Sequence, residues 1–419
     1  MNKFILMLAV FAGLVAAMYQ ATAGTYSYEA SRDGAAAFFT LAKKTEDSIR
    51  KRYQSAGIMS DQTNPLSVKS KVNLLIMPGH EPGYGGAEYK DTFERELNVE
   101  LAGYMRALFE QNGRFQVVVP RDNEQWSSEF KEYFEENYDA IIKFENEQQK
   151  EMAQQLSKGT VKKSENNIVH NAAPTDVAHR LYGINKWAND NDVDMAIHIH
   201  FNDYPRKNSQ VPGKHTGFAI YVPERQYSNS TTTKAIADAI YKRLSKYYPV
   251  SDLPKESVGV IEEQELIAIG SHNTLDAPSM LIEYGYIYEQ QFQYDDTREA
   301  MLKDLAFATY LGVQDFINQN YAPSLTYDVL SLPYTWKKSF SQKGAPRMDT
   351  YALQMALTYL GTYPPVGKTK NDCPISGAFG PCTRDALKAF QRTFNIEQTG
   401  AVGPKTLKLL NEQFTKPTM

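Results

Sequence analysis

The stretch V-N-L-L-I-M-P-G-H at residues 72–80 decides the fold, because it joins an apolar strand to a polar loop. Residues 72–77 are typical of a buried strand, and Pro78-Gly79 ends it. A Gly-rich loop follows, and residues 92–112 then carry apolar side chains at helical spacing. A strand that leads into a helix in this way is the repeating unit of a parallel sheet.

The alternation of strands and helices continues along the chain. It predicts an α/β fold in which a mostly parallel twisted sheet is flanked by helices, in a domain at 71–320. Further strands are expected at 115–120, 193–200, 217–222 and 279–284, and further helices at 175–190, 231–248 and 298–318.

An insertion at residues 127–171 interrupts this alternation. Its first part, 127–157, is predicted to form an acidic amphipathic helix with Phe130, Phe134 and Ile141 on one side. This stripe favours a helix packed on the surface of the domain. The alternative is a lid or an inhibitory arm over the functional site.

The N-terminal residues have the pattern of a secretory signal peptide. Lys3 precedes an apolar run from Phe4 to Tyr19, and Ala21-Thr22-Ala23 offers a small-x-small cleavage site, which predicts a signal at 1–23. The apolar run is shorter than the roughly 18 to 20 residues that span a bilayer, so we expect no membrane span in the mature chain. The protein is therefore expected to be periplasmic or secreted. Residues 24–70 read as a helical extension to which the sequence assigns no role.

Charge and cysteine content narrow the classes of partner. The net charge of −4 gives no electrostatic reason to expect nucleic acid or an anionic membrane. The two cysteines, Cys373 and Cys382, predict one local disulfide in an exported protein. A metal-binding pair is the alternative, but no other Cys and no His after His272 could complete such a site.

The chain of 419 residues is longer than a usual single domain, so a second domain is expected. Residues 321–347 are rich in Pro, Ser, Lys and Tyr without periodicity, which predicts a linker. Helical patterning resumes at Met348, and the second domain is expected at 348–415.

Candidate functional groups lie where predicted strands end, which is where ligands bind in open α/β sheets. His80 directly follows the first strand, and His198 and His200 share one face of the strand at 193–200. A single histidine in such a place is more often a polar loop or core residue than a ligand. Glu283 ends an apolar strand, where an unpaired carboxylate would be costly without a task.

The helix that follows the His80 loop supplies a further acid. Glu94, Glu96 and Glu100 all compete for this role. Acidic residues are also common in a first helical turn merely because they suit the helix dipole.

In order and spacing, these motifs resemble the zinc N-acetylmuramoyl-L-alanine amidases with an AmiC-like catalytic domain. The resemblance covers residues 71–320 and implies Zn²⁺ held by His80, Glu96 and His200, with Glu283 as the catalytic carboxylate. The family's His-x-Asn pattern selects His200 over His198. The resemblance is carried by I-M-P-G-H (76–80), Gly85-Gly86, E-L-N-V-E-L (96–101), A-I-H-I-H-F-N (196–202), Gly217-Phe218 and P-S-M-L-I-E-Y-G-Y (278–286).

Three positions depart from the family pattern: Met77 stands where Asp is usual, His198 where Ser is common, and Glu81-Pro82 where glycines are usual. The metal set remains complete. The activity implied is hydrolysis of the amide between the lactyl group of muramic acid and L-alanine. Two imidazoles and one carboxylate would leave a fourth zinc position open for water.

The C-terminal residues resemble a three-helix peptidoglycan-binding domain found beside many wall hydrolases, which implies peptidoglycan as the partner. The carrying motifs are G-A-F-G (377–380), T-R-D-A-L-K-A-F-Q (383–391) and Thr399-Gly400. The sequence leaves open whether a protein activator is also a partner. Two other functions stay open: a zinc carboxypeptidase or endopeptidase that cuts the stem peptide, and a non-catalytic wall-binding regulator, against which the complete ligand set argues.

Overall fold

The computed structural model describes residues 43–56, 71–164, 173–318 and 327–414. The expected signal peptide at 1–23 and most of the extension at 24–70 lie outside these residues. No helix within the described ranges is both long enough and apolar enough to cross a membrane.

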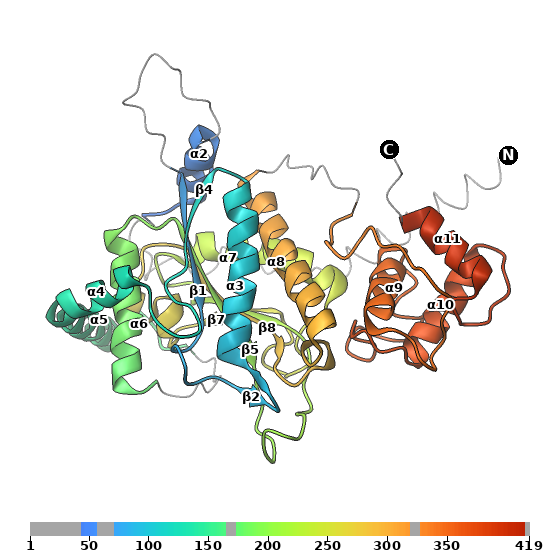
Figure 1. Ribbon diagram of the computed structural model, residues 1–419. Helices are drawn as coiled ribbons and strands as arrows, with labels where there is room; N and C mark the ends of the chain where they lie inside the picture. Colours follow the sequence, from blue (N-terminus) through green and yellow to red (C-terminus); the bar gives the residue numbers. More distant parts are fainter. Residues whose placement is uncertain (1–42, 57–70, 165–172, 319–326, 415–419) are drawn as a thin grey trace. The chain divides into compact units, whose positions relative to one another are not determined.

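A six-stranded sheet forms the centre of the larger domain, with strand order β4-β1-β5-β8-β6-β7 (Figure 1). The first four strands in this order are parallel, β6 is antiparallel to β8, and β7 is parallel to β6. The strands are β1 (Val72–Pro78), β4 (Phe115–Val118), β5 (Met195–Asn202), β6 (Ala219–Pro223), β7 (Val260–Glu263) and β8 (Ser279–Tyr286).

The mostly parallel sheet is therefore confirmed, and β6 explains the antiparallel part. No helix separates β5 from β6, so the chain does not cross back to the other end of the sheet. It re-enters the sheet at the end where β5 finishes, and β6 therefore runs in the opposite direction. The sequence did not predict β7 or the small hairpin of β2 (Glu88–Tyr89) and β3 (Thr92–Phe93), which precedes the first long helix.

Helices cover both faces of the sheet (Figure 1). Strand β1 is buried on both sides: Leu74 and Ile76 pack towards one core, and Leu75 and Met77 towards another. Because both faces are covered, the strand reads as a continuous apolar run. On the first face, helix α8 (Asp295–Ile317) contacts both α3 (Glu94–Gln111) and α7 (Ser230–Tyr247), and on the second face α6 (Thr175–Asp190) contributes to the other core. Short 3-10 turns lie at Ile267–Ile269, Ser271–Asn273 and Gln290–Phe292.

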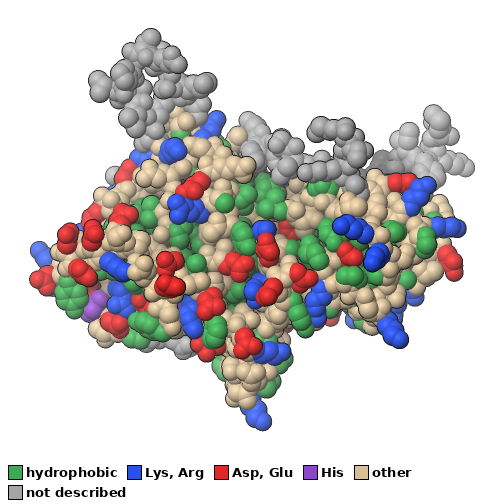
Figure 2. Space-filling view, in the orientation of Figure 1, with side chains coloured by type: hydrophobic (Ala, Val, Ile, Leu, Met, Phe, Trp, Pro, Cys, Tyr) green, Lys and Arg blue, Asp and Glu red, His purple; other side chains and the backbone are tan. Residues whose placement is uncertain are grey.

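The described part of the insertion, 127–164, forms two helices, α4 (Ser128–Glu136) and α5 (Tyr138–Lys158), where the sequence predicted one. They pack on α6: Phe130 contacts Trp187, and a Cβ at Gly183 would meet Phe134 at 3.1 Å, so this glycine permits the close approach. Acidic side chains lie over these helices on the face in Figure 2. The packed arrangement expected from the aromatic stripe is thus present in the described part, 127–164.

Part of the N-terminal extension belongs to the larger domain. Helix α2 (Glu46–Ala56) buries Ile49 and Tyr53, and the Tyr53 hydroxyl donates to Gln314 at 2.8 Å. Arg52 forms an ion pair with the buried Asp194 at 2.5 Å. The helix is therefore an integral part of the packed fold.

Between residues 327 and 414 the smaller domain contains three helices, as expected: α9 (Arg347–Tyr359), α10 (Pro381–Thr393) and α11 (Pro404–Phe414). The disulfide between Cys373 and Cys382 is also confirmed. The described part of the expected linker, 327–346, differs from the prediction. Trp336 in this segment is buried, and its backbone N–H donates to Asn411 on α11 at 2.9 Å, so the segment packs against the helices although it has no periodicity.

Candidate metal centre

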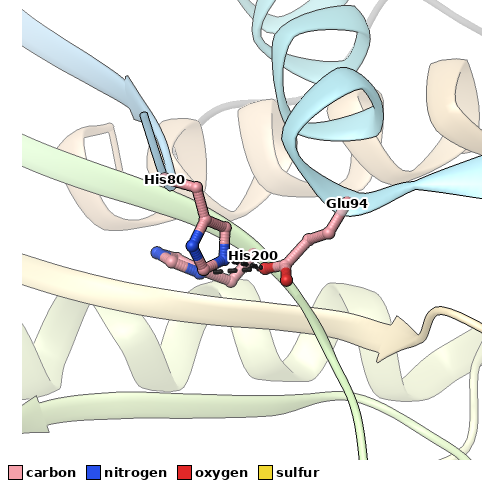
Figure 3. Close-up of side chains that lie close together, drawn as sticks. All are labelled: His80, Glu94 and His200. Atoms are coloured by element: carbon pink, nitrogen blue, oxygen red, sulfur yellow. Dashed lines mark hydrogen bonds and ion pairs between the residues drawn. The ribbon is translucent and has the colours of Figure 1, made fainter. Parts of the chain in front are cut away.

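Three side chains from separate elements meet at the carboxyl ends of the parallel strands (Figure 3). One ligand atom each from His80, Glu94 and His200 lies within 4.8 Å of the others. His80 Nε2 is 2.8 Å from Glu94 Oε1, and His200 Nδ1 is 3.0 Å from the same oxygen. His80 follows β1, Glu94 begins α3, and His200 lies near the end of β5.

Two glycines make room for the imidazole rings. A Cβ at Gly79 would lie 2.3 Å from the His200 ring, and one at Gly86 would lie 2.8 Å from Cδ2 of His80. Gly86 also has a φ of +83°, which favours glycine. Gly79 and Gly86 are therefore needed for the rings to meet.

The acid in this group is Glu94, which corrects the expectation for Glu96. Glu94 is buried, and Glu96, two positions further along α3, is exposed, because residues two apart point to different sides of a helix. Glu94 Oε2 accepts from the Ala87 N–H at 2.7 Å, and Oε1 accepts from the Phe201 N–H at 3.1 Å. These bonds fix the carboxylate towards the two histidines.

The charges of the group suit metal binding. Burial alone would raise the pKa of Glu94, but the neighbouring His80 and His200 outweigh it and hold this pKa below its usual value. Burial lowers the pKa of His200. The acid is thus ionised and His200 neutral, which are the protonation states that ligate a metal.

Glu283 lies beside this group. It pairs with His200 in the register between β8 and β5, as its predicted position at the strand end requires. Burial raises the pKa of Glu283 well above its usual value, and the negative charges of Glu94 and Glu256 raise it further. Its Oε2 has no hydrogen-bond partner among the described residues.

Sequence reasoning missed Glu256, a buried carboxylate near Glu283. It accepts hydrogen bonds from Tyr221 at 2.7 Å, Asn202 at 2.9 Å, Ser251 at 2.5 Å and Tyr286 at 3.1 Å. These donors come from β5, β6, β8 and the loop after α7, so no local pattern in the sequence marks the residue.

His198 is not part of the group. It is buried within β5, and burial lowers its pKa to about 3. The side chain is therefore neutral, and the structure brings His200 rather than His198 to Glu94, as the resemblance implied.

An α/β sheet that gathers two histidines and a glutamate at its strand ends, beside a second buried carboxylate, has the arrangement of a metal-dependent hydrolase. The family model described as N-acetylmuramoyl-L-alanine amidase matches residues 74–315, more than half of the chain. The chain belongs to this family of hydrolases. The model described as a putative peptidoglycan binding domain matches residues 347–410.

Solved structures with a similar fold include three amidases, of which Ami1 and AmiC2 are N-acetylmuramyl-L-alanine amidases. CwlD from Clostridioides difficile, in complex with the GerS lipoprotein, has 18% identity and a TM-score of 0.40, and the match covers 60% of this chain and 100% of that chain. Ami1 from Mycobacterium smegmatis has 14% identity, a TM-score of 0.39 and the same coverage. AmiC2 of Nostoc punctiforme has 16% identity, a TM-score of 0.36 and coverage of 59% and 98%. No curated protein matches the chain.

Proposed function

We propose that this amidase uses Zn²⁺ held by His80, Glu94 and His200, with Glu283 as its catalytic carboxylate. The observation that carries the proposal is the convergence of one atom from each of the three side chains within 4.8 Å. His80 Nε2 is buried without a hydrogen bond of good geometry, although Glu94 Oε1 lies 2.8 Å away. A cation between these atoms would satisfy both.

The donor set fits zinc. Two imidazole nitrogens and one carboxylate oxygen are the ligands of several hydrolytic zinc sites, and they leave a fourth position for water. When bound, the ion lowers the pKa of this water and polarises the scissile carbonyl.

The chain's own groups handle the proton. Glu283 takes a proton from the attacking water at a carboxylate oxygen and delivers it to the nitrogen of the leaving L-alanine. Burial holds the pKa of Glu283 above that of an exposed glutamate, which favours the protonated form that delivers the proton. The products are a glycan with a free lactyl carboxylate and an intact stem peptide.

Peptidoglycan is the partner of the C-terminal domain, which raises the local concentration of substrate for the linked enzyme. We propose that the chain is exported by the N-terminal signal and acts in the periplasm or outside the cell. The disulfide between Cys373 and Cys382 supports an oxidising compartment.

The test measures bound zinc and reaction products of the full chain. The wild type is expected to bind one Zn²⁺ and to release intact stem peptides with a free L-alanine amine from purified cell walls. His80→Ala should lose both the metal and the activity. Shortened stem peptides would instead support the carboxypeptidase or endopeptidase, and wall binding without product would support the non-catalytic regulator.

A further inference from the structure

We infer that the turn at residues 120–127 is a positioning device for His80, and that the insertion helix α4 holds this turn in place. The inference rests on the proposed role of His80 as a metal ligand. It gives the insertion a task other than covering the site.

His80 needs such a device because its backbone is unfavourable. Its φ is +68°, in the left-handed region that non-glycine residues seldom adopt. A conformation of this kind is unfavourable and persists only where surrounding contacts impose it. The residues on both sides of His80 show which contacts these are.

Arg121 holds the residues before His80. Its Nε donates to the Pro78 carbonyl at 3.1 Å, and its Nη2 donates to the Gly79 carbonyl. The same Nη2 donates to the carbonyl of Arg95 at 3.2 Å, directly after Glu94. One buried guanidinium thus ties the His80 loop to the first turn of α3, which carries the acidic ligand.

Trp126 holds the residue after His80. Its Nε1 donates to Glu81 Oε2 at 3.0 Å, and Arg180 of α6 donates to Glu81 Oε1 at 2.8 Å. Glu81 is buried, so both bonds are shielded from water. The side chain that replaces a usual glycine of the family is therefore the anchor of the loop.

The turn itself is rigid. Arg121 and Trp126 face each other in an antiparallel bridge, and Ser127 N donates to the Pro120 carbonyl at 2.8 Å. The Asp122 side chain accepts from the N–H groups of Glu124 at 2.8 Å and Gln125 at 2.7 Å. The side chains of Arg121 and Trp126, which bond to the residues on either side of His80, thus project from one hydrogen-bonded loop.

The insertion fixes the position of Trp126. The ring of Trp126 lies 5.3 Å from that of Phe134 in an edge-to-face contact and 6.4 Å from that of Phe130 in a stacked one. Phe130 is in turn buried against Trp187 of α6. Displacement of α4 would therefore reach His80 through two contacts, Trp126 and Glu81.

The test compares Trp126→Phe and Glu81→Gln with the wild type. Trp126→Phe retains an aromatic ring but removes the Nε1–H donor, and Glu81→Gln retains the shape but removes the charge that pairs with Arg180. Each is expected to raise the zinc dissociation constant about tenfold or more, the usual effect of losing a partner that orients a ligand. In the metal-free protein, the Gly79 amide, which donates to the Ile199 carbonyl, should exchange its hydrogen faster than in the wild type.

Trp336→Phe is the matched control. It removes an indole donor to the Asp349 carbonyl at 2.9 Å in the C-terminal domain, so it should reduce stability without changing zinc affinity or exchange at Gly79. Wild-type zinc affinity and wild-type exchange in both Trp126→Phe and Glu81→Gln would overturn the inference. If the wild type itself bound no zinc, the proposed function would fail, and the exchange measurement would still decide whether the turn holds the loop.

Discussion

Glu283 of β8 lies in register with His200 of β5, so the proposed proton carrier and a proposed metal ligand occupy adjacent positions on two parallel strands. Parallel strands bring their carboxyl ends to one edge of a sheet, and both side chains therefore reach the same place. Because the two side chains belong to different strands, each residue can be substituted separately, and the two proposed roles can be tested one at a time.

Replacement of Glu283 by Gln should abolish catalysis but leave the metal bound. The amide cannot accept the proton, and loss of a general acid or base typically lowers the rate about 10² to 10⁴-fold. The measurement is kcat on a soluble muropeptide together with zinc content. A variant that kept more than a tenth of the wild-type kcat would show that Glu283 does not carry the proton.

The same variant should change how stability of the metal-free protein depends on pH. The pKa of Glu283 is raised in the folded state, so as the pH rises the residue loses its proton first in the unfolded chain, at about pH 4.3. The wild-type protein therefore loses stability progressively as the pH rises above this value. Glu283→Gln cannot ionise and should lose less stability between pH 5 and about 8. Urea unfolding across this range measures the difference. Parallel stability curves for the two proteins would mean that burial does not raise the pKa of Glu283.

Glu94→Gln and Glu96→Gln form a matched pair on the same helical turn. Glu94 is buried between two histidines and Glu96 is exposed, so only the first substitution should remove zinc binding and activity. Isothermal titration with Zn²⁺ and an activity assay on both variants provide the comparison. Loss of zinc from Glu96→Gln with retention in Glu94→Gln would restore the ligand set that the resemblance implied.

The sequence predicts some residues of the site and not others, because strand ends and helix positions place side chains in different ways. His80, His200 and Glu283 each follow or end an apolar strand, and strand ends in this fold converge, so local pattern and topology make them candidates. The resemblance was still needed to choose His200 over His198, which lies on the same face of the strand. Glu94 cannot be chosen in this way, because Glu94, Glu96 and Glu100 share one helix. Glu94 is the acid that enters the site because its carboxylate accepts from the Ala87 N–H and because the short hairpin ends directly before it. Both features are set by tertiary structure.

The same limit applies to the fold. Strands β1, β5 and β8 are long and apolar, and the sequence predicts them. Strand β7 has only four residues and ends in two glutamates, so its pattern is too short to distinguish from a loop. Residues 327–346 pack through single buried side chains such as Trp336. Because these side chains do not recur with a helical or strand period, the sequence of the segment resembles that of a linker.

Gly79→Ala should disrupt the site through His200. The added methyl would lie 2.3 Å from the imidazole ring, so the ring must move out of the metal group. Gly103→Ala is the control, because Gly103 lies exposed within α3 with nothing within 4 Å of its Cβ position. We expect Gly79→Ala to weaken zinc binding at least tenfold, and Gly103→Ala to leave it unchanged and to stabilise the fold by about 0.5 to 1 kcal/mol. Equal zinc affinity in both variants would contradict the packing of Gly79 against His200.

Tyr53→Ala should show that α2 stabilises the larger domain. The substitution empties a buried site and removes the hydrogen bond to Gln314, so the free energy of unfolding should fall by about 3 kcal/mol. Lys51→Ala on the exposed side of the same helix should change it by less than about 0.5 kcal/mol. Chemical denaturation of the full chain, followed by far-ultraviolet circular dichroism, gives both values. A Tyr53→Ala loss as small as that of Lys51→Ala would mean that α2 is not part of the cooperative fold.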